Sequence, residues 1–229
     1  MLNDLYQTLD PIAFSIGPFS ARWYGIAYAL GFLLAAVVIY FVGKRWKMRF
    51  DFENICVIIG GRLGYVLVYN GPFYAAHPLE VLNFANGGMS FHGGLVGALL
   101  AGIVAAKIIK MPYLSLLDVA IIGVPIGLFF GRCANFVNGE LWGVVFGGSA
   151  GMMPRHPSQL YEALFEGAVL FIILFAMSFK KPPFPRGAYI GTFLVGYGIF
   201  RFLVEFIRQP DAQIGYLLGD WFTMGQLLS

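Results

Sequence analysis

The chain has 229 residues, of which 59% are hydrophobic and 12% are charged, and its mean hydropathy is +0.74. Soluble domains carry about 25% charged residues, so this composition excludes a soluble globular protein and indicates an integral membrane protein with little mass outside the bilayer. The net charge of +3 gives no cue for binding nucleic acid. The two cysteines, Cys56 and Cys133, match no metal-binding or redox spacing.

The apolar stretches predict an all-α fold. Residues 1–20 are mixed in polarity and are expected to lie along one membrane face. Six stretches of about span length follow, and residues 215–229 begin a seventh that is too short to complete a span. The predicted spans cover residues 23–42, 52–69, 91–109, 116–130, 158–179 and 189–206. We therefore expect one integral membrane domain over residues 1–229, a polytopic helical protein with about seven transmembrane helices, the last one truncated.

Lysines and arginines are distributed unevenly between alternate loops. One set of loops contains Lys44, Arg45, Lys47, Arg49, Lys107, Lys110, Lys180, Lys181 and Arg186. The opposite set contains no lysine. The positive-inside rule places lysine-rich loops in the cytoplasm. It therefore predicts an external N-terminus and places residues 131–143 on the external face.

A polar stretch, GRCANFVNGELWG at residues 131–143, directly follows an apolar run. It contains Arg132, Asn135, Asn138 and Glu140, and hydrocarbon tolerates such groups only with partners. Its glycines suit irregular backbone, which at membrane depth needs protein or a wet cavity around it. A guanidinium beside two carboxamides is a donor-rich patch for a phosphate or a carboxylate. On the residues alone, a polar loop that caps a helix end is an equal alternative.

The last complete span carries a narrow charged stripe. Its members are Tyr197, Arg201, Glu205 and Arg208, at spacings that confine them to an arc of about 80°. Such a stripe must face the bundle interior or water, although an Arg–Glu pair that locks two helices is a structural alternative. Two other predicted spans also carry polar faces: Gln159, Glu162 and Glu166 on one, and Arg62, Tyr65 and Tyr69 on the other.

His92 opens the third predicted span and is followed by two glycines that leave room for a substrate. A neutral imidazole is a natural proton acceptor near pH 7. The alternative is a histidine satisfied by a carbonyl at a helix start. The three histidines are too scattered to suggest a metal site. On the fourth span, Gly123, Gly127 and Gly131 recur every four residues and predict close helix packing.

At these residues the sequence resembles the bacterial prolipoprotein diacylglyceryl transferase family. The matching motifs are SIGPFSARWYGIAYALGF at 15–32, GGRLGYVLVYN at 60–70, SFHGGLVG at 90–97, GRCANFVNGELWG at 131–143, RHPSQLYEA at 155–163 and GYGIFRFLVEFIRQPDAQ at 196–213. They occur in order along nearly the whole chain. The resemblance implies a bundle of seven helices in the bacterial inner membrane, with the N-terminus and active-site loops on the periplasmic side.

The resemblance also implies a reaction that needs no metal or organic cofactor. The sn-1,2-diacylglyceryl group of phosphatidylglycerol moves to the thiol of the lipobox cysteine in a prolipoprotein signal peptide. A thioether forms and glycerol phosphate leaves. The implied partners are phosphatidylglycerol, prolipoprotein signal peptides with a lipobox cysteine, and membrane lipids, with no nucleic acid.

Roles carried over from the family fit the demands of this chemistry. A free thiol is mostly protonated near neutral pH, and His92 is the candidate base. Arg132 and Arg201 would hold the phosphate and stabilise the charge that grows as the C–O bond breaks. Glu205 would orient Arg201 or serve as the rival base. The expected substrate-binding residues are Tyr24, Arg62, Asn135, Asn138, Glu140, Gly143, Tyr197 and Arg208, and among them Asn135, Asn138 and Glu140 would also fix Arg132.

A membrane anion or lipid transporter is the alternative function. The inward-facing arginines Arg62, Arg201 and Arg208 motivate it. A carrier usually has repeated halves and broken helices near the midplane. The sequence contains no matching halves, and its polar groups gather toward one face, so the transferase is favoured.

Overall fold

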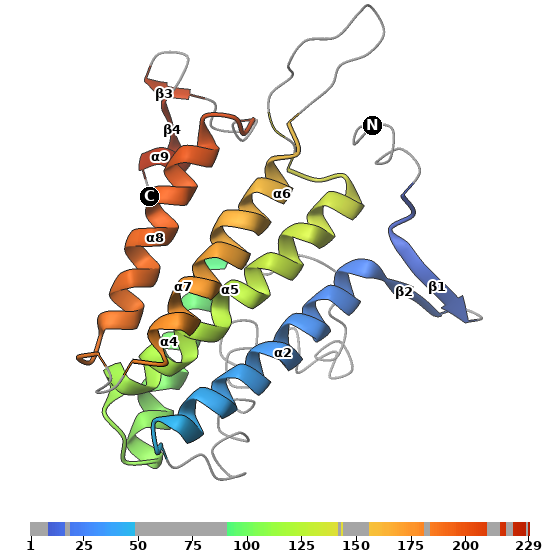
Figure 1. Ribbon diagram of the computed structural model, residues 1–229. Helices are drawn as coiled ribbons and strands as arrows, with labels where there is room; N and C mark the ends of the chain where they lie inside the picture. Colours follow the sequence, from blue (N-terminus) through green and yellow to red (C-terminus); the bar gives the residue numbers. More distant parts are fainter. Residues whose placement is uncertain are drawn as a thin grey trace, which may run out of the picture.

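The computed structural model describes most of the chain as a bundle of helices with two small strand pairs (Figure 1). It describes residues 9–16, 19–48, 91–141, 143, 156–180, 184–209, 216–218, 222–227 and 229. The helices are α2 (Trp23–Arg45), α4 (Phe91–Ile108), α5 (Tyr113–Asn138), α6 (Ser158–Glu162), α7 (Leu170–Met177), α8 (Ala188–Glu205) and α9 (Met224–Leu227). A π-helical segment, η2 (Ala163–Val169), joins α6 to α7 without a break.

Four helical stretches are long and apolar enough to cross a membrane, among the residues that the structure describes. They are Trp23–Arg45, Tyr113–Asn138, Ser158–Met177 and Ala188–Glu205. Each overlaps a predicted span, and α4 occupies the place of the span predicted over 91–109. The span predicted over 52–69 lies outside the described residues. The helical, multi-pass fold class is therefore confirmed.

Helix α5 lies at the centre of the bundle, between α2 on one side and α6, η2 and α7 on the other (Figure 1). The predicted small-residue packing is confirmed at its contact with α2. A Cβ atom on Gly123 would lie 2.9 Å from Ile39 Cδ1 and 3.0 Å from Ala35 Cβ. One helical turn further on, a Cβ atom on Gly31 would lie 3.4 Å from the Cα atom of Gly127. The close approach of the two helices therefore depends on the glycine at position 123, while the contact of Gly31 with Gly127 is at ordinary van der Waals distance.

The predicted end of the fourth span is wrong. We expected the span to stop near residue 130 and irregular backbone to begin at Gly131, but α5 continues to Asn138. Arg132, in this last part, pairs with Glu162 on a neighbouring helix, so its charge gives no reason for the helix to end. It ends instead at Gly139, whose φ of 70° is left-handed and whose N–H donates to the Asn135 carbonyl.

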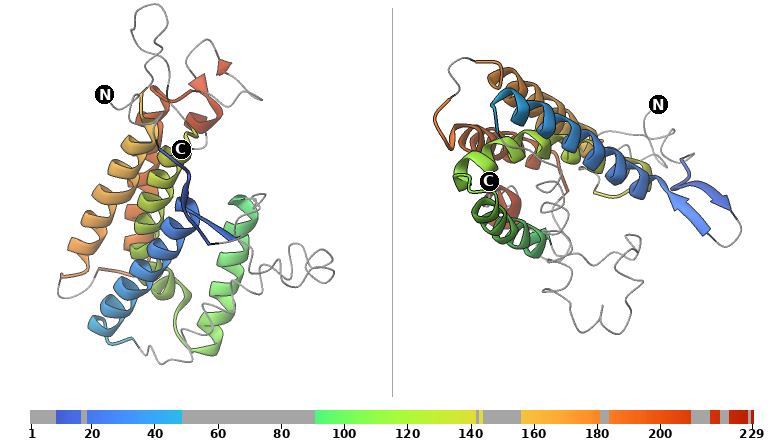
Figure 2. Two further views of the ribbon diagram at one scale, coloured as in Figure 1. Left: turned by 90° about the vertical axis from the view of Figure 1, so that its right-hand side faces the viewer. Right: turned by 90° about the horizontal axis from the view of Figure 1, so that it is seen from below.

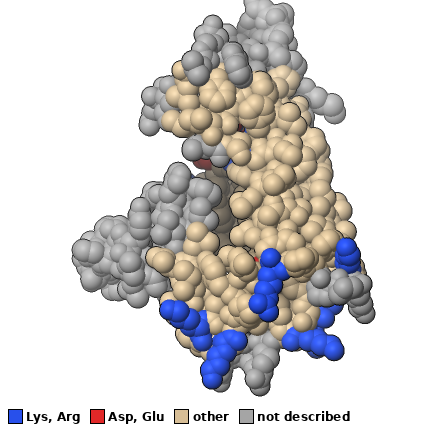
Figure 3. Space-filling view, turned by 90° about the vertical axis from the view of Figure 1, so that its left-hand side faces the viewer, with Lys and Arg blue, Asp and Glu red and all other residues tan. Residues whose placement is uncertain are grey.

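On the face shown in Figure 3, lysines and arginines gather at one end of the bundle, whereas the exposed Arg22 lies at the other end of α2. Lys44 and Arg45 lie in the last turn of α2, and Lys107 lies in the last turn of α4. We call this the basic end. Its composition agrees with the loop asymmetry found in the sequence.

Strands β3 (Tyr216–Leu218) and β4 (Phe222–Thr223) lie at the opposite end of the bundle, and strands β1 (Ile12–Ile16) and β2 (Phe19–Arg22) lie about halfway up it, next to the start of α2 (Figure 1). Strands β1 and β2 form an antiparallel hairpin that projects sideways from the start of α2 (Figure 2). Its exposed Phe14 is compatible with the membrane-face position predicted for this segment. Strands β3 and β4 pair next to the end of α8 and are followed by the four-residue helix α9. The prediction that residues 215–229 begin a seventh transmembrane helix is therefore wrong for the residues described there, because their backbone groups pair across two strands instead.

Candidate functional site

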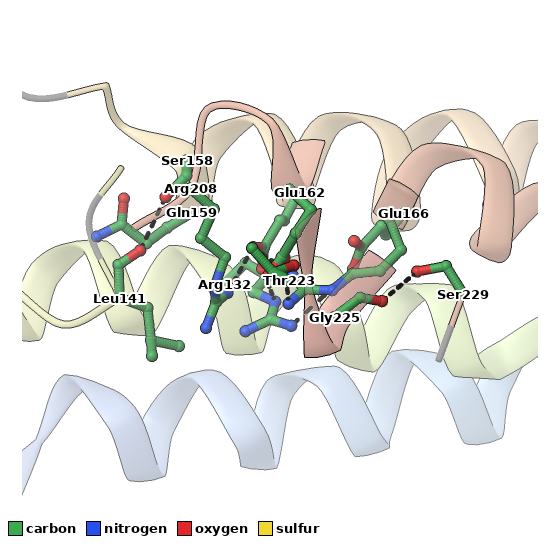
Figure 4. A network of polar contacts seen from close by, with 12 residues as sticks. Arg132, Leu141, Ser158, Gln159, Glu162, Glu166, Arg208, Thr223, Gly225 and Ser229 are labelled. Atoms are coloured by element: carbon green, nitrogen blue, oxygen red, sulfur yellow. Dashed lines mark hydrogen bonds and ion pairs between the residues drawn. The ribbon is translucent and has the colours of Figure 1, made fainter. Parts of the chain in front are cut away.

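One buried carboxylate, that of Glu162, is the centre of the site (Figure 4). The side chain is fully buried at the end of α6. Its Oε1 lies 2.8 Å from Arg201 Nη1 and 2.6 Å from Arg208 Nη1, and its Oε2 lies 2.6 Å from Arg132 Nε. We call Arg132, Arg201 and Arg208 the arginine cluster. A buried charge is stable only where it is paired. Glu162, on α6, therefore ties this helix to α5, to α8 and to the segment that follows α8.

The arginine cluster is brought together from distant parts of the sequence. Arg132 lies in the last two turns of α5, Arg201 lies near the end of α8, and Arg208 follows α8. The sequence predicted that Arg201 and Arg208 face the bundle interior with Glu205. This holds, since Glu205 and Arg208 are buried and Arg201 is largely so.

A second buried carboxylate lies one turn beyond the first. Glu166 is fully buried in η2, and its Oε2 is 4.0 Å from Arg132 Nη2. Neither of its carboxylate oxygens has a hydrogen-bond partner within the described part of the chain. The π-helical turn that carries it is a rare conformation, which occurs frequently at functional sites.

Close packing of η2 against α5 sets the distance between these carboxylates and Arg132. Gly167 follows Glu166 directly. A Cβ atom on Gly167 would lie 2.7 Å from Phe129 Cβ and 2.8 Å from Phe129 Cα. Only glycine therefore allows η2 to approach α5 this closely.

Glu205 is held from two sides. Its Oε2 lies 2.7 Å from Arg201 Nη2, one helical turn away on α8, and its Oε1 accepts a hydrogen bond of 2.9 Å from Thr223 Oγ1. Gly225, in α9, lies against the same carboxylate with no room for a side chain. The segment from β4 to α9 thus covers the outer side of the Arg201–Glu205 pair.

The loop that follows α5 is fixed by hydrogen bonds to the start of α6. Ser158 Oγ donates to the Leu141 carbonyl over 2.8 Å, and Gln159 Nε2 donates to the Glu140 carbonyl. Gly143 N–H donates to the His156 carbonyl over 2.9 Å. Gly143 also forms an isolated antiparallel bridge with Arg208, and a Cβ atom there would meet the Ile207 carbonyl. Gly143 therefore joins the ends of three helical segments.

The other predicted binding residues have more local contacts. Asn135 Nδ2 donates to Glu140 Oε2 over 3.1 Å. Asn138 Oδ1 is buried without a hydrogen-bond partner among the described residues. Tyr24 shares a hydroxyl hydrogen bond of 3.1 Å with its neighbour one turn along α2. Tyr197 is partly buried on α8, one turn before Arg201.

Two predicted residues are placed only in part or not at all. His92 lies in the first turn of α4, but its side chain is outside the described residues, as is the whole of Arg62. We expected Asn135, Asn138 and Glu140 to fix Arg132. The ion pairs of Arg132 go instead to Glu162 and Glu166.

The sequence did not identify Glu162 and Thr223 as members of the site. The shared face of Gln159, Glu162 and Glu166 was visible as a pattern, but a helical face does not name its partner on another helix. Thr223 lies in a short polar-apolar segment with no periodicity, and only its contact with Glu205 reveals it.

Comparisons with known proteins agree on one family. Residues 11–229 match the sequence profile of the family described as prolipoprotein diacylglyceryl transferase. A phosphatidylglycerol–prolipoprotein diacylglyceryl transferase of Geobacter sulfurreducens is 45% identical, and the match covers 98% of this chain and 91% of the relative. Proteins of the same name from Rickettsia canadensis and Sinorhizobium medicae are 43% and 45% identical, with 98% of this chain covered in both and 93% and 88% of the relatives.

Proposed function

Because this chain belongs to the prolipoprotein diacylglyceryl transferase family, we propose that its arginine cluster holds the phosphate of phosphatidylglycerol during transfer. The protein is a membrane transferase of lipoprotein biosynthesis that moves a diacylglyceryl group from phosphatidylglycerol to a prolipoprotein. The transporter alternative is not favoured, since the relatives matched over nearly the whole chain are named as transferases.

The observation that supports this role is the convergence of three guanidinium groups on Glu162. Each guanidinium carries five N–H donors in a fixed fork, more than its contacts with the buried carboxylates use. Arginine is suited to binding phosphate because two of these donors can engage two oxygens at once. The cluster is therefore preorganised for a phosphate that arrives beside Glu162.

The proposed step balances one bond formed against one bond broken. The lipobox thiol of a prolipoprotein signal peptide gives up its proton, and its sulfur bonds to the glycerol carbon of the diacylglyceryl group. The bond from that carbon to the phosphate oxygen breaks, and glycerol phosphate leaves with the electron pair. Arg132 and Arg201 stabilise the negative charge that grows on the leaving phosphate, each by about 3 kcal/mol.

The thiol proton goes to His92, with Glu205 as the alternative base. The described contacts of Glu205 support the orienting role instead, because its carboxylate is engaged by Arg201 on one side and by Thr223 on the other. Binding of the lipid head group involves Tyr24, Arg62, Asn135, Asn138, Glu140, Gly143, Tyr197 and Arg208.

We further propose that the protein lies in the bacterial inner membrane with its basic end in the cytoplasm. The collection of lysines and arginines at that end supports this orientation. The arginine cluster and strands β3 and β4 then lie toward the periplasmic side, where lipobox cysteines are exposed to the outer leaflet.

A transfer assay tests the role of the arginine cluster. Membranes containing the protein are given labelled phosphatidylglycerol and a peptide with a lipobox cysteine. Arg132→Ala and Arg201→Ala should each lower the rate of peptide labelling by about 10² or more. Arg45→Ala, an exposed arginine at the basic end, is the matched control and should leave the rate unchanged. Full activity in both cluster variants would refute the proposal, and anion flux without peptide modification would favour a transporter.

A further inference from the structure

Asp118 makes an unusual contact between two helices, far from the arginine cluster. It lies in the second turn of α5 and is only 3% exposed. Its carboxylate accepts three backbone hydrogen bonds from the start of α8. Oδ2 accepts from Gly187 N–H over 2.6 Å, and Oδ1 accepts from Tyr189 and Ile190 N–H over 3.2 and 3.1 Å.

This carboxylate supplies the cap that α8 does not have of its own. The first four N–H groups of a helix have no partner within the helix, and the N-cap residue of α8 is Gly187, which has no side chain to accept them. A carboxylate at this position is also favoured by the helix dipole. Because the donors are backbone groups, the contact fixes the α8 backbone along its axis as well as against α5.

A second contact anchors α7 at the same level. Tyr189, which is 1% exposed, donates from its hydroxyl to the Met177 carbonyl at the end of α7 over 3.1 Å. Asp118 and Tyr189 therefore join α5, α7 and α8 at the basic end. At the opposite end, α5 carries Arg132 and α8 carries Arg201, and α7 is continuous through η2 with α6, which carries Glu162.

Helices α5 and α8 have the same number of residues between the Asp118 contact and their arginine in the cluster. Arg132 follows Asp118 by 14 residues along α5, and Arg201 follows Gly187 by 14 residues along α8. Both helices run from the basic end toward the arginine cluster (Figure 1). At about 1.5 Å per residue, each guanidinium is carried about 21 Å from the contact with Asp118. Because the two helical segments are equally long, the guanidinium groups of Arg132 and Arg201 lie at the same level of the bundle as Glu162.

We infer that Asp118 is a positioning residue for the transfer reaction, which sets the axial register of α8 against α5 and thereby aligns Arg201 with Arg132 on one phosphate. This inference rests on the proposed function of the arginine cluster. It assigns to Asp118 no contact with either substrate. A displacement of about 1 Å in a catalytic group can cost about 10²-fold in rate, so loss of the register should act at the distant site.

The first test combines Asp118→Asn with Arg201→Lys in the transfer assay. Residues this far apart with no shared contact normally have independent effects, within a factor of about 2. If Asp118 acts through Arg201, Asp118→Asn should lower kcat at least tenfold when residue 201 is arginine and by much less when it is lysine. Ser178→Ala is the matched control, since Ser178 is buried at the same end and its hydroxyl, the group that the substitution removes, donates to the Phe175 carbonyl within its own helical turn. Independent effects, or a loss no larger than that of Ser178→Ala, would overturn the inference.

The second test measures the register itself. Spin labels are attached at Val124 on α5 and Leu203 on α8, two exposed positions, after the native cysteines are replaced by serine. Asp118→Asn, and Asp118→Glu as a variant that keeps the charge, should shift or broaden the distance distribution, whereas Ser178→Ala should not. An unchanged distribution in both Asp118 variants would overturn the inference whether or not the protein transfers lipid. A wild type that modifies no peptide would instead overturn the proposed function.

Discussion

At the scale of single residues, the arrangement depends on Glu162 as the shared partner of three arginines. Removing one member of a buried ion pair typically costs about 3–5 kcal/mol, because the other member is left as an unpaired buried charge. For Glu162 the loss would affect three guanidinium groups at once. Its importance therefore follows from its contacts even though it is not expected to touch the reacting atoms.

Glu162→Gln should lower both the stability and the activity of the protein. The amide keeps the shape of the side chain but removes the charge that holds the arginine cluster. We expect a clear fall in the Tm of the purified protein and a loss of transfer activity of at least about 10²-fold. Asp10→Asn, which neutralises an exposed acid in the N-terminal segment, should change neither. A Glu162→Gln protein with wild-type Tm and rate would show that the cluster does not depend on this carboxylate.

The base assignment makes a separate prediction about pH. Only a neutral imidazole accepts a proton, and histidine ionises near pH 6.5. If His92 is the base, the transfer rate of the wild type should rise with pH through this region, while His92→Gln should be slow at every pH. The pH–rate profiles of the wild type, His92→Gln and Glu205→Gln between about pH 5 and 8 provide the measurement. A flat wild-type profile would point to Glu205 or to no ionising base.

At the scale of elements, the packing of η2 against α5 determines how close Glu162 and Glu166 lie to Arg132. We expect Gly167→Ala to force η2 away from α5, because the added methyl group would overlap the backbone of Phe129. Transfer activity and Tm should both fall. Gly191→Ala on α8 is the matched control, since a Cβ atom there meets nothing within 4 Å, and alanine favours a helix over glycine. Equal behaviour of the two variants would contradict this account of the packing.

The sequence predicted which helices form more accurately than it predicted the residues at which they end. Apolar length placed the helices at residues 23–45, 158–177 and 188–205 within a few residues. It failed at α5 because the rule that polar residues end a span assumes that they face lipid or water. Arg132 finds its partner, Glu162, on another helix, and such a partner is not visible in local sequence. The π-helical form of η2 has no pattern in the sequence that would predict it.

At the scale of the whole molecule, exposed basic residues and buried ion pairs lie mostly in different parts of the bundle. Most described exposed lysines and arginines collect at the basic end, with Arg22 as an exception, while the buried ion pairs lie toward the other end. The sequence predicted this separation and the inward stripe of α8. The convergence of α5, α6 and α8 on one carboxylate depends on how the helices pack, which periodicity and composition do not specify.

This separation predicts the orientation of the protein in the membrane. Single cysteines at Phe14 and at Lys110, introduced after the native cysteines are replaced by serine, report the two sides of the membrane, and both positions are exposed. In intact spheroplasts a membrane-impermeant thiol reagent should label the cysteine at position 14. The cysteine at position 110 should react only after lysis. The reverse pattern would place the basic end in the periplasm, against the positive-inside rule.

The shared contact with Glu162 also bears on which anions the site admits. The three guanidinium groups already have a carboxylate between them, so an incoming anion must compete with a counter-ion that the fold itself supplies. Inorganic phosphate or chloride brings nothing to offset that competition. A phospholipid does, because its acyl chains remain in hydrocarbon while its head group enters. The built-in carboxylate therefore favours lipid over small soluble anions, and selectivity against abundant phosphate follows from an internal ion pair rather than from a closed entrance.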